Sequence, residues 1–302
     1  MPRQVPSLRA LAGISRAPFL LLPVALIGTT TSIAYCTSTI QSIDVILALI
    51  GLLSLHIAVD SINEAGDAQS GIDDKTERTP FSGGSGTIQK GDISIRFAYI
   101  WGLTFAGLGA AIGVWFLYTK GTILLPIFLA GAVCVLTYTH WLLRTGLGEV
   151  FAGLGLGALP VLGGSLVLSG EIPNAALACA TLAFFMTFNL LLLAEFPDTV
   201  ADRIGGRKHL VILLGTRTSG GIYMLAGLGV PFSLGVSILI GALPVLTILA
   251  AIPTLLLLPA FRTLLKPTNR GIPIPALAGN VFWNLSTHVV LMVTIWISCK
   301  FI

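Results

Sequence analysis

Two clusters of acidic residues carry the chemistry that this chain is equipped to do. They occupy residues 60–78 and 195–208, and each follows a long apolar run. Carboxylates gathered in this way cannot neutralise one another and need cations. Oxygen ligands combined with water and phosphate oxygens suit Mg²⁺, which is usually held by one or two carboxylates together with a substrate phosphate. Two such clusters facing each other would hold Mg²⁺ ions around a diphosphate.

The spacing within each cluster predicts a helical face of oxygen ligands. Positions 60, 63 or 64, and 67 recur every three or four residues, so a continuing helix places their side chains on one side. Glu195, Asp198 and Asp202 repeat this interval, and Pro197 is the point where that helix would kink or restart. The alternative is that the residues of both clusters are ordinary solvated loop charges. The matched spacing in the two clusters disfavours this alternative.

Basic residues close to the two clusters would complete a clamp on diphosphate oxygens. The candidates are Arg78, Arg144, Arg207 and Lys208. A glycine-rich stretch at residues 83–86 would either approach phosphate through backbone N–H groups or serve as a flexible lid, and the sequence alone leaves both open.

The elements that position these residues are transmembrane helices. The 302 residues are 55% hydrophobic and only 10% charged, which is outside the usual balance of a soluble domain. Apolar stretches of about 18 residues or more recur along the chain, and each is long enough to cross a bilayer. The sequence predicts an all-α polytopic protein with one domain, residues 1–302, in which about nine helices surround a central cavity. They are expected at about 17–36, 44–66, 94–118, 121–141, 149–169, 173–194, 219–240, 242–262 and 280–299.

The distribution of basic residues predicts the orientation. With a cytoplasmic N-terminus, all but two of the 17 Lys and Arg residues fall on the cytoplasmic side, and the exceptions are Lys120 and Lys300. Active-site loops at about 64–93 and 195–218 then face the cytoplasm, and residues 266–276 form the last cytoplasmic loop. This topology accounts for the net charge of +4, so no nucleic-acid partner is expected.

The four cysteines are predicted to be small core residues. Cys36, Cys134, Cys179 and Cys299 lie singly in apolar runs, without the short spacings of metal sites or of a disulfide framework.

At these residues the chain resembles the UbiA superfamily of intramembrane prenyltransferases. Asn63 and Asp67 match its N-x-x-x-D signature, and residues 70–73, Ser-Gly-Ile-Asp, look like the branch that prenylates 1,4-dihydroxy-2-naphthoate for menaquinone. Asp198 and Asp202 match the second motif, D-x-x-x-D, with residues 206–215 resembling the segment that follows it. Residues 138–149, from Tyr-Thr to Gly-Leu-Gly-Glu, resemble a third family segment. Each segment alone is a weak signal, but three of them in the family's order are together specific for this superfamily.

The resemblance implies a reaction and a set of roles. It implies Mg²⁺-dependent transfer of a polyprenyl group from its allylic diphosphate to an aromatic acceptor, within membrane lipid. The Mg²⁺ ligands would be Asn63, Asp67, Asp198 and Asp202, and Asp73 would be a further catalytic ligand or acceptor-side group. Arg78, Arg144, Arg207 and Lys208 would bind the diphosphate.

Two further residues have an ordinary and a functional interpretation. Glu149 opens a predicted helix, where the helix dipole alone favours a carboxylate, but it could also orient the acceptor. Tyr138 is an interfacial aromatic residue or a substrate-binding one. No role is assigned to His209.

Several other functions remain open. A 4-hydroxybenzoate, homogentisate or glyceryl-lipid acceptor is possible, since Asp60 stands where the family more often has Asn or Gln. A transporter would have many helices too, but its acidic residues would line a continuous pore. The phosphotransferases that use CDP-alcohols share D-x-x-x-D but need an upstream D-G-x-x-A-R, which is not found near residue 198. A member that has lost catalysis and acts as a scaffold would not need the intact motif residues.

Overall fold

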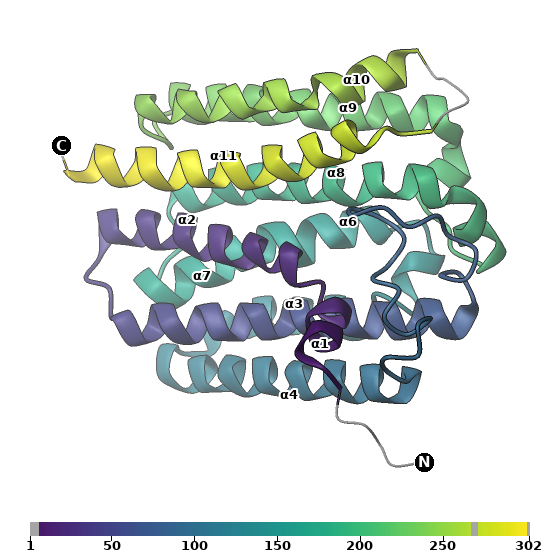
Figure 1. Ribbon diagram of the computed structural model, residues 1–302. Coiled ribbons are helices and arrows are strands. Elements are labelled where there is room, and N and C mark those ends of the chain that lie inside the picture. The colour runs from purple at the N-terminus through teal and green to yellow at the C-terminus, as the bar shows by residue number, and fades with distance from the viewer. Residues whose placement is uncertain (1–5, 267–270, 301–302) are drawn as a thin grey trace.

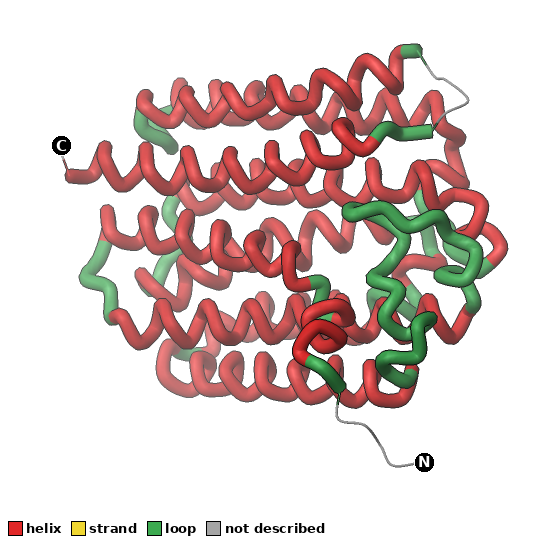
Figure 2. The backbone as a smooth tube through the Cα atoms, in the orientation of Figure 1, coloured by secondary structure: helices red, strands yellow, loops and turns green. Residues whose placement is uncertain are grey.

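Helices make up the regular structure of the chain. The structure is a computed structural model that describes residues 6–266 and 271–300, and these ranges contain helices and no strand. Figures 1 and 2 show the long helices side by side along a common axis. In chain order the elements are α1 (Leu8–Ile14), η1 (Ala17–Leu20), α2 (Leu21–Thr37), α3 (Ser42–Ser70), α4 (Ile95–Lys120), η2 (Thr122–Leu124), α5 (Leu125–Thr137), η3 (Leu142–Arg144), α6 (Gly148–Gly153), η4 (Leu154–Ala158), α7 (Leu159–Ser169), α8 (Asn174–Ile204), α9 (Leu210–Leu239), η5 (Val245–Leu257), α10 (Leu258–Leu265) and α11 (Ile274–Lys300).

The predicted all-α membrane architecture is confirmed. Eight helical segments of the described chain are long and apolar enough to span a bilayer, and the segment at the fourth predicted position, Thr122–Thr137, is a shorter apolar helix. Large apolar side chains cover the outside of the bundle, for example Leu239 (87% exposed) and Leu225 (74% exposed). Outside a bilayer, so much exposed apolar surface would drive aggregation.

Both acidic clusters lie on helices that are longer than predicted. Helix α3 continues to Ser70 and α8 to Ile204, although the predicted helices stop at 66 and 194. Pro197 lies inside α8 without ending it. The loops between helices are therefore shorter than the predicted 64–93 and 195–218, and consist of residues 71–94 and 205–209. Of the predicted last loop, residues 267–270 lie outside the described ranges.

Buried polar side chains connect three helices in the interior. Asn189 of α8 donates from Nδ2 to the carbonyl oxygen of Tyr223 in α9 (2.9 Å). The Tyr223 hydroxyl donates to Oδ1 of Asn280 in α11 (3.0 Å), and Asn280 donates from Nδ2 back to the Asn189 carbonyl (2.9 Å). Hydrogen bonds of this kind fix the relative rotation of helices that have no hydrophobic driving force between them in lipid.

The prediction that all four cysteines are small core residues was wrong for two of them. Cys36 near the end of α2 and Cys299 near the end of α11 form a disulfide, with 5.4 Å between their Cα atoms. The two residues are 263 positions apart, and only the packing of α2 against α11 brings them together. Cys134 and Cys179 are buried and free, as predicted. The disulfide lies at the end of the bundle opposite the acidic clusters (Figure 1).

Breaking this disulfide is expected to lower the free energy of unfolding by about 2 kcal/mol, which is the low end of the usual range. The low end is expected because helices that remain inserted after unfolding already restrict the conformations of the chain. Thermal unfolding of Cys36→Ser in detergent, with and without reductant, measures the effect. Reductant should lower the Tm of wild type and of Cys134→Ser but leave the Tm of Cys36→Ser unchanged. A reductant effect of equal size in Cys36→Ser would contradict the assignment.

Candidate active site

A polar cavity lies where the ends of α3 and α8 meet the loop of residues 71–94. Its volume is about 70 Å³, and a cavity that holds one water needs about 10–15 Å³. It therefore has room for several ions or phosphate oxygens. Its charged and amide lining residues are Arg16, Asn63, Asp67, Asp73, Glu195, Asp198, Asp202 and Arg207. The structure thus brings both predicted motifs to one cavity.

Arg207 connects the two motifs electrostatically. Its guanidinium pairs with Asp67 of α3 and, at 3.2 Å, with Oδ1 of Asp202 of α8. With its amide oriented to suit its neighbours, Asn63 donates to Asp67 Oδ2 (3.2 Å) and accepts from Arg207 (3.0 Å). Burial alone would lower the pKa of Arg207, but the carboxylates of Asp67 and Asp202 outweigh burial and raise it. Arg207 is a permanent cation at the centre of the carboxylate cluster.

The glycine-rich part of the 71–94 loop closes one side of the cavity. Gly83 donates its N–H to Asp198 Oδ2 (3.2 Å), which ties the loop to α8. At Gly84, where φ is +72°, an added Cβ would lie 2.8 Å from a carboxylate oxygen of Asp73, so only glycine fits. Glu64 accepts hydrogen bonds from both the N–H and the hydroxyl of Ser85, and this ties the same loop to α3. The loop is held on both sides by acidic side chains.

Asp73 differs from the other acids in lying on the loop. It is buried, and Gln89 donates to its Oδ2 (3.3 Å). Burial, and then the negative charges of Asp67 and Glu64, raise the pKa of Asp73 to about 7. Without an added cation, its carboxyl group is therefore partly protonated near neutral pH.

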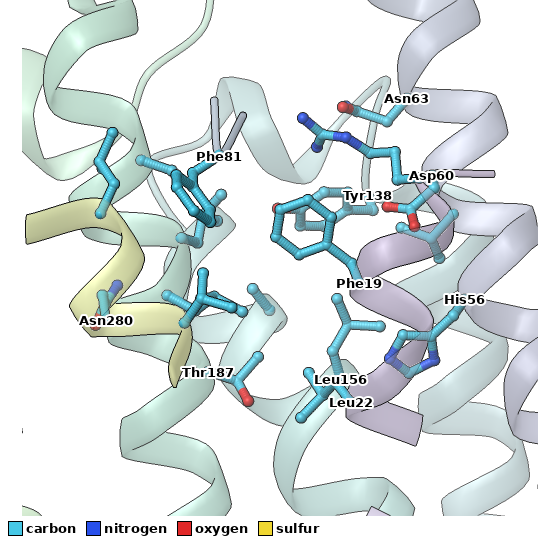
Figure 3. A pocket seen from close by; sticks show the side chains of 18 residues that line it. Phe19, Leu22, His56, Asp60, Asn63, Phe81, Tyr138, Leu156, Thr187 and Asn280 are labelled. Atoms are coloured by element: carbon cyan, nitrogen blue, oxygen red, sulfur yellow. The ribbon is translucent and has the colours of Figure 1, made fainter. Parts of the chain in front are cut away.

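A second, mostly apolar cavity adjoins the first (Figure 3). Asn63 lies at its polar end, Phe19 and Tyr138 lie in its middle, and Leu22 and Leu156 lie at the far end. The two cavities share the lining residues Arg16, Asn63, Phe81, Tyr138, Leu191 and Ala194. Burial is the main cause that raises the pKa of Tyr138 above its ordinary range, so its hydroxyl remains protonated at the junction. The arrangement suits a ligand with a highly charged head and a long apolar tail.

The donor set in the polar cavity fits divalent cations. Asp198 Oδ1 is buried and has no hydrogen-bond partner among the described residues, although its other oxygen is bound by Gly83. Asp67 and Asp202 contribute further carboxylate oxygens, with Arg207 as the cation that pairs with both. Buried carboxylates that outnumber their cations, in a cavity roomy enough for phosphate, match the all-oxygen coordination of Mg²⁺.

Three of the four predicted diphosphate-binding cations do not reach the cavity. Arg78, Arg144 and Lys208 are exposed and are not among its lining residues. The Arg78 guanidinium instead donates to the backbone carbonyl oxygen of Asp73 (2.9 Å). The N–H of Lys208 donates to the Leu143 carbonyl (2.9 Å), which fixes the backbone with the side chain exposed. Glu149, for which the sequence left open a helix-dipole role and an acceptor-orienting one, lines neither cavity.

Several cavity residues, and one residue that fixes the loop, received no individual role from the sequence. Arg16 lines both cavities, and its guanidinium lies 3.5 Å from Glu64. Because Arg16 comes just before the first span, the sequence indicated only that it contributes to the positive charge of the cytoplasmic side. Glu64, which holds the loop, and Glu195 lie on the predicted faces of oxygen ligands but were not among the four residues expected to bind Mg²⁺. Phe81 lines both cavities and carries no sequence signal. The helical spacing did place Glu64 and Glu195 beside the motif residues.

Comparison with known proteins gives a consistent result. The profile of the UbiA prenyltransferase family matches residues 21–286. A structure of a UbiA homologue from Archaeoglobus fulgidus bound to GPP and Mg²⁺ is similar over 95% of this chain and 99% of its own, with a TM-score of 0.69 and 14% identity.

Two other structures show the same similarity of fold. An apo UbiA homologue from Aeropyrum pernix K1 matches with a TM-score of 0.67 and 17% identity, over 92% of this chain and 96% of its own. A digeranylgeranylglyceryl phosphate synthase matches over 98% of this chain and 99% of its own, with a TM-score of 0.65 and 14% identity. No curated protein sequence matches the chain.

Proposed function

The chain belongs to the UbiA prenyltransferase family, and from that premise we propose that it transfers a polyprenyl group from an allylic diphosphate to an aromatic acceptor. One observation carries the proposal: a carboxylate-lined cavity opens directly into an apolar one. A diphosphate fits the first, and the start of a prenyl chain fits the second. The A. fulgidus homologue is bound to GPP, which is a prenyl diphosphate, and to Mg²⁺, so its ligands are of the kinds proposed for these two cavities.

We assign Asn63, Asp67, Asp198 and Asp202 to hold Mg²⁺, with Asp73 on the loop as a further ligand or acceptor-side group. Bound Mg²⁺ would stabilise the charge that develops on the diphosphate as the allylic bond breaks. These four residues come from two rigid helices, α3 and α8, so their geometry is set before the substrate arrives.

The remaining cavity residues bind the head of the substrate and exclude water. Arg207 is the cation best placed for diphosphate oxygens, since its forked guanidinium already lies between Asp67 and Asp202. Arg78, Arg144 and Lys208 are assigned to attract the diphosphate from outside. The loop at Gly83 covers the polar cavity, and Phe19, Phe81 and Tyr138 surround the junction, where the allylic carbon would lie. Excluding water there directs the reactive carbon to the acceptor.

The proposed acceptor is 1,4-dihydroxy-2-naphthoate, as in menaquinone biosynthesis. The support is the Ser-Gly-Ile-Asp stretch at residues 70–73, in which Asp73 comes six positions after Asp67. A glyceryl lipid is the alternative to test beside it, given the similar fold of the digeranylgeranylglyceryl phosphate synthase. Tyr138 lies at the junction and would orient the acceptor, whereas Glu149 would act only indirectly.

The defining experiment supplies purified protein in lipid with a labelled polyprenyl diphosphate, Mg²⁺ and one acceptor at a time. The acceptors are 1,4-dihydroxy-2-naphthoate, 4-hydroxybenzoate, homogentisate and a glyceryl phosphate. Prenylated naphthoate alone would support the assignment, and product with another acceptor would correct it. No product with any of them would overturn the proposed aromatic acceptor.

We also propose that the N-terminus and the active site face the cytoplasm. The distribution of Lys and Arg supports this orientation. The Cys36–Cys299 disulfide supports it independently, because it lies at the opposite end of the bundle and disulfides persist in oxidising compartments.

Removal of divalent metal is expected to abolish prenyl transfer. Without added cations, the carboxylates of the two motifs would repel the diphosphate, so both substrate binding and leaving-group stabilisation are lost. Initial rates after EDTA treatment, followed by Mg²⁺ titration, measure this. Restoration by Mg²⁺ but not by the same ionic strength of NaCl is expected. Full activity in excess EDTA would exclude the assignment of the carboxylates to Mg²⁺.

A further inference from the structure

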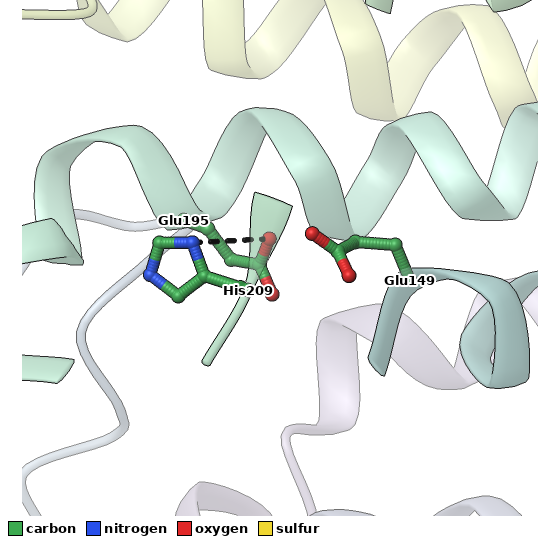
Figure 4. A group of neighbouring side chains, drawn as sticks. All are labelled: Glu149, Glu195 and His209. Atoms are coloured by element: carbon green, nitrogen blue, oxygen red, sulfur yellow. Dashed lines mark ion pairs between the residues drawn. The ribbon is translucent and has the colours of Figure 1, made fainter. Parts of the chain in front are cut away.

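A compact group of buried ionisable side chains lies behind the polar cavity. Glu149 at the start of α6, Glu195 in α8 and His209 just before α9 each offer a ligand atom, and these atoms lie within 4.8 Å of one another (Figure 4). The exposed fractions are 0% for Glu149, 5% for Glu195 and 1% for His209. Three separate elements thus converge on one buried point.

The ligand atoms of this group lack ordinary partners. Oε2 of Glu149, Oε2 of Glu195 and both ring nitrogens of His209 make no hydrogen bond within the described part of the chain. Buried polar atoms are almost always hydrogen-bonded, and leaving one unpaired costs about 1–3 kcal/mol, more for a charged group. Several unpaired atoms directed at one point indicate a missing common partner.

The carboxyl groups of Glu149 and Glu195 lie within hydrogen-bonding reach of each other if one holds a proton, and a partner shared by two ionised carboxylates would need positive charge. Among the described residues, no Lys or Arg forms an ion pair with Glu149 or Glu195, and the nearby Arg207 is engaged by Asp67 and Asp202. His209 is the basic group that faces Glu195, with 3.8 Å between Nδ1 and Oε2. One imidazole cannot neutralise two buried carboxylates.

We propose that Glu149, Glu195 and His209 bind a transition-metal dication, of the Zn²⁺ type, at a site separate from the proposed Mg²⁺ site. An imidazole nitrogen with two carboxylates suits Zn²⁺, whereas Mg²⁺ prefers oxygen alone. Tetrahedral Zn²⁺ with bonds of about 2.0–2.2 Å places its ligand atoms about 3.3–3.6 Å apart. The ligand atoms here lie within 4.8 Å of one another, so the three side chains would draw together on binding.

The surroundings fit the second shell of such a site. His209 Nε2 lies 3.4 Å from Oδ2 of Asp202, so Nδ1 is the nitrogen that faces the metal position and Nε2 can donate to the carboxylate. Glu149 is fixed through Oε1, which accepts from the N–H of Leu210 (2.6 Å). Glu195 lines the polar cavity and provides the entry path. The metal would join α6, α8 and α9, and would position Asp202 through His209.

The test measures metal binding by the full chain without substrate, so it does not depend on the proposed reaction. Metal-stripped protein is titrated with Zn²⁺ in millimolar Mg²⁺, metal content is measured by mass spectrometry, and Co²⁺ serves as a spectroscopic substitute. Wild type should retain about one Zn²⁺ per chain. Three protein ligands, with a water in the fourth position, are a known coordination of Zn²⁺. Glu149→Gln and His209→Gln should each raise the Kd for Zn²⁺ by at least about 100-fold, since even second-shell changes cost 10–100-fold.

Two controls separate the alternatives. Glu171→Gln, which alters an exposed carboxylate, and Asp198→Asn, which alters the proposed Mg²⁺ site, should both retain Zn²⁺. Glu195→Gln serves if either ligand variant does not fold. The proposal is overturned if wild type retains no Zn²⁺ and shows no Co²⁺ spectrum, in which case protons neutralise the carboxyls. It is also overturned if Asp198→Asn loses Zn²⁺ as fully as Glu149→Gln does, which would place the ion in the diphosphate cavity.

Discussion

Asp198→Asn is expected to reduce kcat/KM for prenyl transfer by at least about 10³-fold, the upper end of the loss seen when one group that stabilises a transition-state charge is removed. Asparagine keeps the shape of the side chain and can still accept the Gly83 N–H, so the loop should stay in place. The change removes the charge of a carboxylate whose other oxygen, Oδ1, is buried without a hydrogen-bond partner. Initial rates over a range of Mg²⁺ concentrations would show both the fall in rate and a higher Mg²⁺ requirement.

Asp74→Asn is the matched control for this variant. Asp74 belongs to the same acidic sequence cluster as Asp73, but its side chain is exposed and does not line the cavity. Wild-type activity is expected in Asp74→Asn. If Asp198→Asn kept its activity within about tenfold of wild type, a difference of only about 1.4 kcal/mol, then Asp198 would not be a metal ligand.

The helical parts of the site could be predicted from the sequence because helical geometry is periodic. Once α3 and α8 continue through residues 67 and 202, the spacing of three and four residues sets which side chains share a face. Charge placement and apolar length similarly predicted the membrane bundle. These features depend on local sequence, so they do not require knowledge of how distant segments pack.

The parts that could not be predicted depend on distant contacts. Arg207 and Lys208 are adjacent and both basic, yet only Arg207 enters the cavity. The turn at residues 205 and 206 and the hydrogen bond from the Lys208 N–H to Leu143 set this difference. The contact between Glu64 and Ser85 and the Cys36–Cys299 disulfide likewise join segments that no spacing rule connects.

Arg207→Lys is expected to lower kcat/KM by about 10²-fold, although the charge is kept. Lysine supplies a single point charge, whereas the planar guanidinium pairs with Asp67 and Asp202 together and presents a fork that matches phosphate oxygens. Arg203→Lys is the control, because Arg203 is on the same segment but is exposed. Comparable activity in the two lysine variants would show that forked geometry at position 207 is not used.

Arg207→Ala tests whether Arg207 and Mg²⁺ neutralise the same carboxylates. Asp67 and Asp202 are almost fully buried, and removing their cation should destabilise the protein by about 3–5 kcal/mol in EDTA. If Mg²⁺ bound together with the diphosphate replaces that cation, adding both should raise the Tm of Arg207→Ala by more than that of wild type. An equal rise in both proteins would mean that Asp67 and Asp202 do not bind the metal. The two expected results together, loss of stability in EDTA and its recovery with substrate, would identify Arg207 as the cation that holds the two motifs ready for Mg²⁺.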